Sequence, residues 1–151
     1  MRYIILTLTI LFGLSSFSQE FAAEFRINQF QGDNYFQVNA GVLANFDISE
    51  TLKIETGLRI NGLNNDDPPL SIPVNFKYYK NVNGFYFKGG FEYIDGGFAG
   101  KGEMINGGIG VGYDIDDKFT VVADYSIPLD NSAYTNSFGI SLQYHFNKLI
   151  D

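Results

Sequence analysis

The chain has 151 residues and no cysteine. Neither a disulfide framework nor a thiolate metal site is therefore available, and stability has to come from the fold itself. Basic residues are also scarce, because 10 Lys and Arg stand against 17 Asp and Glu, for a formal net charge of −7 without a basic cluster. This balance argues against nucleic acid and anionic lipid as electrostatic partners.

The chain also lacks the features of several domains or of a membrane-spanning helix. After residue 18 there is no helical periodicity, no linker and no low-complexity segment. The apolar stretch 3–14, which follows Arg2, is far shorter than the roughly 20 residues of a membrane-spanning helix. Small residues, Ser16 and Ser18, precede an expected cleavage. We therefore predict a signal peptide over 1–18, rather than a retained anchor helix, and one domain over 19–151.

The feature that is present is a repeat of eight runs in which apolar and polar side chains alternate. A period of two is that of a β-strand with one apolar and one polar face. The runs span residues 21–30, 36–46, 52–60, 70–78, 85–93, 105–115, 119–127 and 137–146. Such a series after an export signal predicts an all-β protein, an eight-stranded antiparallel up-and-down transmembrane β-barrel in the outer membrane of a Gram-negative bacterium.

The connections between the runs differ in length, as expected for this topology. Short connections suit the periplasmic side, where both termini are then expected, and longer ones suit the external side. The tight turns are 47–50, 81–84 and 116–117, and the longer connections are 61–69, 95–103 and 130–136. The first external connection, 31–34, is short and departs from this pattern.

Charged side chains decide which face of the runs meets lipid. An ionised group facing lipid at mid-bilayer costs roughly 2 to 4 kcal/mol, so the polar face is expected to point inward. That face carries five cations and five anions, which can pair to neutrality: Glu24, Arg26, Lys53, Glu55, Arg59, Lys77, Lys88, Glu92, Asp114 and Asp124. Side chains can fill the interior of an eight-stranded barrel. We therefore predict an interior closed by this charge network, with at most a narrow pore.

Three other features could carry chemistry, and each has a simpler interpretation. His145, the one histidine, could act with Ser141 or Ser137 and a carboxylate, but no oriented third group is identifiable. The segment 64–67 lacks the glycine and the spaced acids of a calcium loop, and the glycine-rich segment 107–112 has the wrong spacing for a phosphate loop. No catalytic residue, metal or cofactor is predicted.

Several segments are similar to a known family. The segments 70–79 (LSIPVNFKYY), 108–113 (GIGVGY) and 117–125 (DKFTVVADY) resemble the porin-like outer-membrane β-barrel domain family of small bacterial barrels. The last run resembles the assembly signal of that family, carried here by Gly139, Leu142, Tyr144 and Phe146. The resemblance implies that the barrel-assembly machinery reads this run during biogenesis. The chain departs from the family pattern by continuing to residue 151 after the aromatic signal, and no peptidoglycan-binding domain is expected.

These observations favour a small integral outer-membrane barrel without enzymatic activity, monomeric and surrounded by outer-membrane lipid. Its expected role is structural or lies in surface interactions. One alternative is a soluble exported barrel, similar to lipocalins, with its apolar face turned inward around a small hydrophobic ligand. Another is an outer-membrane lipid-modifying hydrolase that uses His145. The first two hypotheses predict opposite faces for the apolar side chains.

Overall fold

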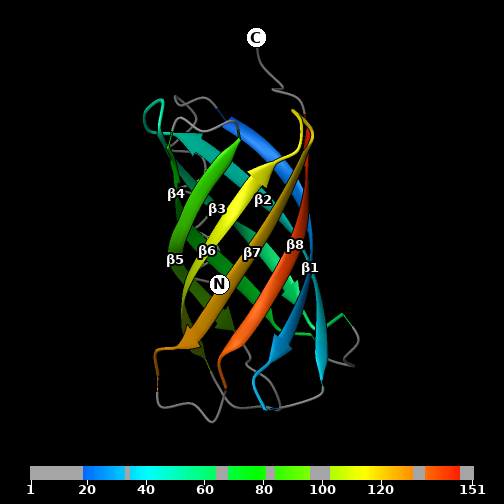
Figure 1. Cartoon of the computed structure of the whole chain (residues 1–151). Helices are drawn as coiled ribbons and strands as arrows, with labels where there is room; N and C mark the ends of the chain where they lie inside the picture. The colour runs from blue at the N-terminus through cyan, green and yellow to red at the C-terminus, as the bar shows by residue number, and fades with distance from the viewer. Residues whose placement is uncertain are drawn as a thin grey trace.

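The computed structural model shows a closed barrel of eight strands (Figure 1). It describes residues 19–32, 35–63, 68–80, 84–95, 103–130 and 135–146. The strands are β1 (Gln19–Phe30), β2 (Phe36–Asp47), β3 (Leu52–Asn61), β4 (Leu70–Tyr79), β5 (Phe85–Asp95), β6 (Met104–Asp114), β7 (Phe119–Pro128) and β8 (Ser137–Phe146). The predicted fold class is confirmed. Strand β1 begins before the predicted run, at Gln19, and β6 begins and ends one residue earlier than predicted.

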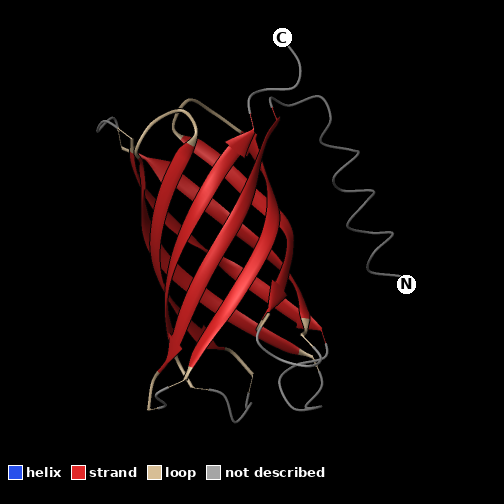
Figure 2. Cartoon of the chain, turned by 90° about the vertical axis from the view of Figure 1, so that its right-hand side faces the viewer, coloured by secondary structure: helices blue, strands red, loops and turns tan. Residues whose placement is uncertain are grey.

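Every strand pairs antiparallel with its neighbours in sequence, and β1 pairs with β8 to close the sheet. Arg26 on β1, for example, lies opposite Asn39 on β2 and Ser141 on β8. The strands are strongly tilted to the barrel axis (Figure 2), as closure of a barrel requires. We call the end at which β1 begins and β8 ends the terminal end. No helix among the described residues is long and apolar enough to cross a bilayer.

Side chains alternate between the two faces of the sheet, and the apolar ones point outward. Strand β8 alternates between buried and exposed residues along its whole length. Ile109, at the middle of β6, is 70% exposed, whereas Glu55 and Gln143 on the inner face are fully buried. This arrangement is the opposite of the one that a soluble lipocalin-like barrel requires. It suits a barrel whose outer surface is covered by lipid.

The ladder between β3 and β4 is interrupted at Pro73. Paired residues are Thr56 with Val74 and then Arg59 with Ser71, without pairs between them. Proline has no N–H to donate to a ladder, so the interruption follows from the sequence. On its other side Pro73 stays in register with Glu92 of β5. The sheet therefore remains closed around the interior.

Two turns at the terminal end share a sequence pattern and a hydrogen-bond pattern. Asp47-Ile48-Ser49-Glu50 leads from β2 to β3, and Asp114-Ile115-Asp116-Asp117 leads from β6 to β7. The N–H of Ile48 donates to the carbonyl of Leu52 (2.9 Å), and the N–H of Ile115 donates to the carbonyl of Phe119 (2.8 Å). The two matched turns hold Asp47 and Asp114 at equivalent positions on the terminal rim.

Candidate functional site

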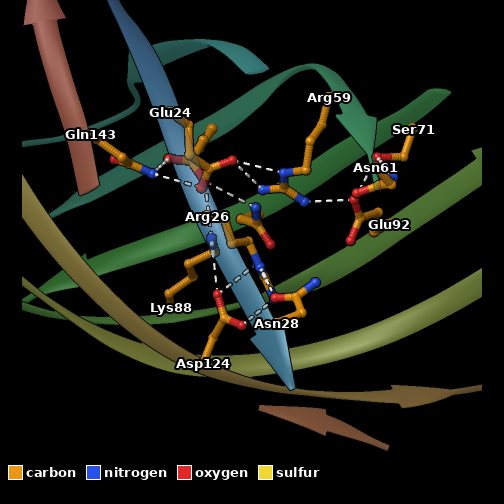
Figure 3. Close-up of polar contacts among 12 residues, drawn as sticks. Glu24, Arg26, Asn28, Arg59, Asn61, Ser71, Lys88, Glu92, Asp124 and Gln143 are labelled. Carbon is orange, nitrogen blue, oxygen red and sulfur yellow. Dashed lines mark hydrogen bonds and ion pairs between the residues drawn. The ribbon is translucent and has the colours of Figure 1, made fainter. Parts of the chain in front are cut away.

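The interior is organised around three groups of ion pairs. Figure 3 shows the groups around Arg26 and Arg59. In the first, Arg26 of β1 reaches across to Asp124 of β7. Nη1 of Arg26 donates to Oδ2 of Asp124 (2.9 Å), and Nη2 donates to Oδ1 (2.5 Å). Nε of Arg26 donates to Oδ1 of Asn28 (2.5 Å). This planar, two-pronged contact is the geometry in which a guanidinium binds a carboxylate most strongly.

The second group is centred on Arg59 of β3, which lies between two carboxylates. Its Nε donates to Oε2 of Glu24 (2.7 Å), and its Nη1 donates to Oε1 of Glu92 (2.5 Å). The hydroxyl of Ser71 also donates to Oε1 of Glu92 (2.5 Å) and accepts from Nδ2 of Asn61 (2.7 Å). Arg59 therefore ties together β1, β3 and β5 across the interior.

The third group is centred on Glu55 of β3. Nζ of Lys77 lies 2.6 Å from Oε2 of Glu55, and Nζ of Lys88 lies 3.3 Å from Oε1. Lys88 also lies 3.8 Å from Oδ2 of Asp124, which links this group to the first. The amide of Asn75 donates to Oε1 of Glu55 (3.0 Å). Each cation thus faces a carboxylate inside the barrel.

Gln143 of β8 connects the second and third groups. Its amide nitrogen donates to Oε2 of Glu55 (3.1 Å) and to Oε1 of Glu24 (3.5 Å). The sequence placed Gln143 on the inner face but gave no sign of this bridging position. The connected set contains four cations and four anions, so its formal charge is zero: Arg26, Arg59, Lys77, Lys88, Glu24, Glu55, Glu92 and Asp124. We call these eight residues the interior network.

The structure sets the other two predicted members, Lys53 and Asp114, apart from the interior network. Nζ of Lys53 lies 3.2 Å from Oδ1 of Asp47 and 3.6 Å from Oε2 of Glu20. Asp114 accepts a hydrogen bond from the hydroxyl of Thr120 (2.7 Å). Both therefore belong to the terminal rim, together with Glu20 and Asp47, which the sequence analysis did not assign to the interior.

An open vestibule of about 830 Å³ occupies the terminal end. Its lining residues include Glu20, Asn45, Lys53, Lys77, Tyr79, Asp114, Thr120 and His145. Beyond it, two small spaces of about 20 and 30 Å³ lie beside Arg26, each comparable with one or two water molecules. Side chains of the interior network separate the vestibule from these spaces.

His145 lies in the wall of the vestibule, but the structure does not bring it to the predicted serines. Its Nε2 lies 2.8 Å from Oγ1 of Thr120, and its Nδ1 lies 3.0 Å from Oε1 of Glu20. The hydroxyl of Ser141 has no hydrogen-bond partner, although Ser141 and Ser137 are buried on the inner face. The structure therefore does not form the considered catalytic pair of His145 with Ser141 or Ser137 as the nucleophile.

Metal and phosphate sites have little support in the described part of the chain. Its His, Asp and Glu side chains form no group of three that could hold a metal ion. The segment 64–67 lies outside the described residues. The glycine-rich segment 107–112 is a part of strand β6, not a loop before a helix.

The four residues of the predicted assembly signal lie on two faces of β8. Leu142, Tyr144 and Phe146 are exposed on the outer face. The centroid of the Tyr144 ring lies 5.2 Å from the ring centroid of Phe119 and 5.5 Å from that of Phe146. Gly139 lies on the inner face, against Arg26 and Asn28. The three outward residues lie on one face of β8, whereas the position of Gly139 is explained by the interior.

Comparisons with known proteins agree with this geometry. A family model described as the outer membrane protein beta-barrel domain matches residues 4–146. No curated protein matches the chain by sequence. The N-terminal β-barrel domain of Pseudomonas aeruginosa OprF is 12% identical, with a TM-score of 0.56 over 84% of this chain and 97% of that one.

Two further solved structures share the fold. A structure from the de novo design of transmembrane β-barrels is 19% identical, with a TM-score of 0.54 over 84% of this chain and 95% of that one. Ail of Yersinia pestis in a phospholipid nanodisc is 10% identical, with a TM-score of 0.51 over 84% of this chain and 99% of that one. At these identities the likeness concerns the barrel architecture alone.

Proposed function

The chain belongs to the outer membrane protein beta-barrel domain family. We propose that it acts without catalysis, as a closed barrel in the outer membrane. The connections between strands at the end opposite the terminal end would then be its surface for interaction. The protein is a small integral outer-membrane β-barrel. Its proposed role is to strengthen the envelope or to offer a surface for interaction, with at most a narrow pore.

The interior network is the observation that carries this proposal. Arg59 alone joins β1, β3 and β5, and Arg26 joins β1 to β7. Cations and anions match in number, and each cation of the network lies within ion-pair distance of a carboxylate. A buried charge that is left without its partner is costly. Such an interior favours a permanently closed bore over a route for solutes.

Single-channel recording in planar bilayers tests this proposal. The wild-type barrel is expected to show no sustained conductance of the kind that a wide aqueous pore gives. A triple variant, Arg59→Met with Glu24→Gln and Glu92→Gln, removes the charges around Arg59 while keeping their approximate volumes. It is expected to conduct more than the wild type. A large, steady conductance of the wild-type protein would contradict the proposal.

The proposed partners are outer-membrane lipid and, during biogenesis, the barrel-assembly machinery. The exposed side chains of Leu142, Tyr144 and Phe146 support this role, because they form one outward row at the end of β8. Phe146→Ala is expected to slow membrane insertion, measured by the appearance of the folded species with time. Ile105→Ala, on the outer face of β6 at the other end of the barrel, is the control. Equal rates for both variants would count against β8 as a signal.

We also infer that the barrel is monomeric. The closed sheet leaves no strand edge unpaired, and unpaired edges are the usual route to strand-mediated association. Light scattering of the detergent-solubilised protein, corrected for detergent, is expected to give the mass of one chain. A dimer mass that persists on dilution would contradict this inference.

A further inference from the structure

Four inward side chains on four neighbouring strands form one continuous chain of contacts at the terminal end. They are Glu20 (β1), His145 (β8), Thr120 (β7) and Asp114 (β6). Oε1 of Glu20 lies 3.0 Å from Nδ1 of His145, and Nε2 of His145 lies 2.8 Å from Oγ1 of Thr120. The Thr120 hydroxyl donates to Oδ1 of Asp114 (2.7 Å). Two carboxylates therefore end a chain that has an imidazole and a hydroxyl at its centre.

The number of hydrogen atoms decides which contacts can exist together. A protonated imidazole donates from both ring nitrogens, so it can serve Glu20 and the oxygen of Thr120 at once. The Thr120 hydroxyl then keeps its own hydrogen for Asp114. In this state the ion pair between Nδ1 and Glu20, which lacks the geometry of a hydrogen bond, exists together with both contacts of the Thr120 hydroxyl.

A neutral imidazole cannot satisfy all three. With its hydrogen on Nδ1, it serves Glu20, and Nε2 needs the one hydroxyl hydrogen of Thr120, which Asp114 then loses. With its hydrogen on Nε2, the lone pair of Nδ1 faces the carboxylate of Glu20. Removing one proton from His145 therefore breaks a contact at one end of the chain or the other.

We propose that His145 is a proton-operated switch in the wall of the terminal vestibule. In the protonated state it directs the Thr120 hydroxyl onto Asp114 and joins β1, β8, β7 and β6 into one polar chain. In the neutral state the Glu20 carboxylate, 3.0 Å from Nδ1, favours the tautomer with its hydrogen on Nδ1, so Nε2 takes the hydroxyl hydrogen of Thr120 and the Asp114 carboxylate is released toward the vestibule. The switch goes beyond the proposed function of a closed, non-catalytic barrel and does not depend on it.

Charged and titratable groups facing the vestibule from the other elements are Lys53 on β3, Lys77 and Tyr79 on β4, and Asp116 and Asp117 in the turn before β7. Lys77 is engaged by Glu55, and Lys53 by Asp47 and also by Oε2 of Glu20 (3.6 Å), the carboxylate whose other oxygen faces His145. His145 is 8% exposed and lines the open vestibule, so protons from solvent can reach it.

The experiment is a pH titration of the folded protein in detergent micelles by nuclear magnetic resonance. Because the chain has a single histidine, the ring nitrogen signals belong to His145 without ambiguity. We expect the carboxyl-carbon shift of Asp114 to change with the same midpoint as the ring nitrogens. In Thr120→Val, which lacks the hydroxyl, the ring is expected to titrate while the Asp114 shift no longer follows it.

Two further variants keep the test decisive. Thr120→Ser retains a hydroxyl and is expected to preserve the shared midpoint, which provides a readout if Thr120→Val does not fold. Thr56→Val, on the outer face of β3, is the matched control and is expected to leave the titration unchanged. An Asp114 shift that stays constant through the His145 titration in the wild type would overturn the proposal. The proposal would also be overturned if, in Thr120→Val, the Asp114 carboxyl-carbon shift still changed with the same midpoint as the His145 ring nitrogens.

Discussion

Gly139 on β8 faces the guanidinium of Arg26 on β1, so closely that a Cβ at position 139 would lie 2.6 Å from Nη2 of Arg26. The same Cβ would lie 2.6 Å from Oδ1 of Asn28. Because Gly139 has no side chain, Arg26 has the space to extend toward Asp124. This contact also lies at the junction of the first and last strands, where the barrel closes.

Gly139→Ala is expected to displace Arg26 from Asp124. Overpacking of a filled interior costs about 1 to 3 kcal/mol, and we expect a loss of that size in the free energy of unfolding. Urea unfolding in detergent, followed by circular dichroism, measures it. Gly89→Ala is the matched control, because a Cβ there would lie 3.8 Å from the Gly108 carbonyl, an ordinary contact. A comparable loss in the control would show that the Arg26 contact is not the cause.

Arg59→Met is expected to destabilise the barrel far more than Lys53→Met. Arg59 is buried, and its removal leaves Glu24 and Glu92 without their cation, a change that costs about 3 to 5 kcal/mol. The side chain of Lys53 is 27% exposed at the rim, where an ion pair contributes at most about 1 kcal/mol. Urea midpoints of the two variants check this order. Equal losses would contradict the separation between interior and rim.

The positions of the strands and the direction of their faces could be read from the sequence, because both depend on local alternation. On β8 every predicted inward residue is buried and every predicted outward residue is exposed. The run 21–30 began too late, and this error hid Glu20, which extends the inner face of β1 to the rim. A polar residue next to a predicted cleavage site gave no reason to extend the strand.

The partners across the interior could not be read from the sequence. Alternation places Lys53 and Lys77 on the same face, and they are neighbours in register, yet Lys77 pairs with Glu55 and Lys53 with Asp47 and Glu20. Which carboxylate a lysine meets depends on strand tilt and on the stagger between strands. Residues of one short segment do not determine these quantities, so the sequence predicted a charge balance without its pairs.

Ile109→Arg tests the direction of the outer face. Ile109 is 70% exposed, more than any other large apolar side chain in the described part of the chain, and an arginine facing lipid near the midplane costs about 2 to 4 kcal/mol. We expect the variant to leave less folded protein in the membrane fraction after a urea wash, judged by heat-modifiable electrophoretic mobility. Ile109→Leu is the control and should match the wild type. Normal membrane retention of the arginine variant would mean that this face does not meet lipid.

Tyr86 and Gly112 provide the last test, because their relationship is one of shape rather than charge. Tyr86 is fully buried on the inner face of β5, and a Cβ at Gly112 of β6 would overlap its ring. Gly112→Ala should therefore destabilise the wild type, yet have little further effect in a Tyr86→Ala background, where the ring is gone. Residues in direct contact show interaction energies of about 0.5 to 3 kcal/mol in a double-mutant cycle. Urea unfolding of the four proteins gives this value, and additive losses would mean that the glycine is needed for a reason other than the tyrosine ring.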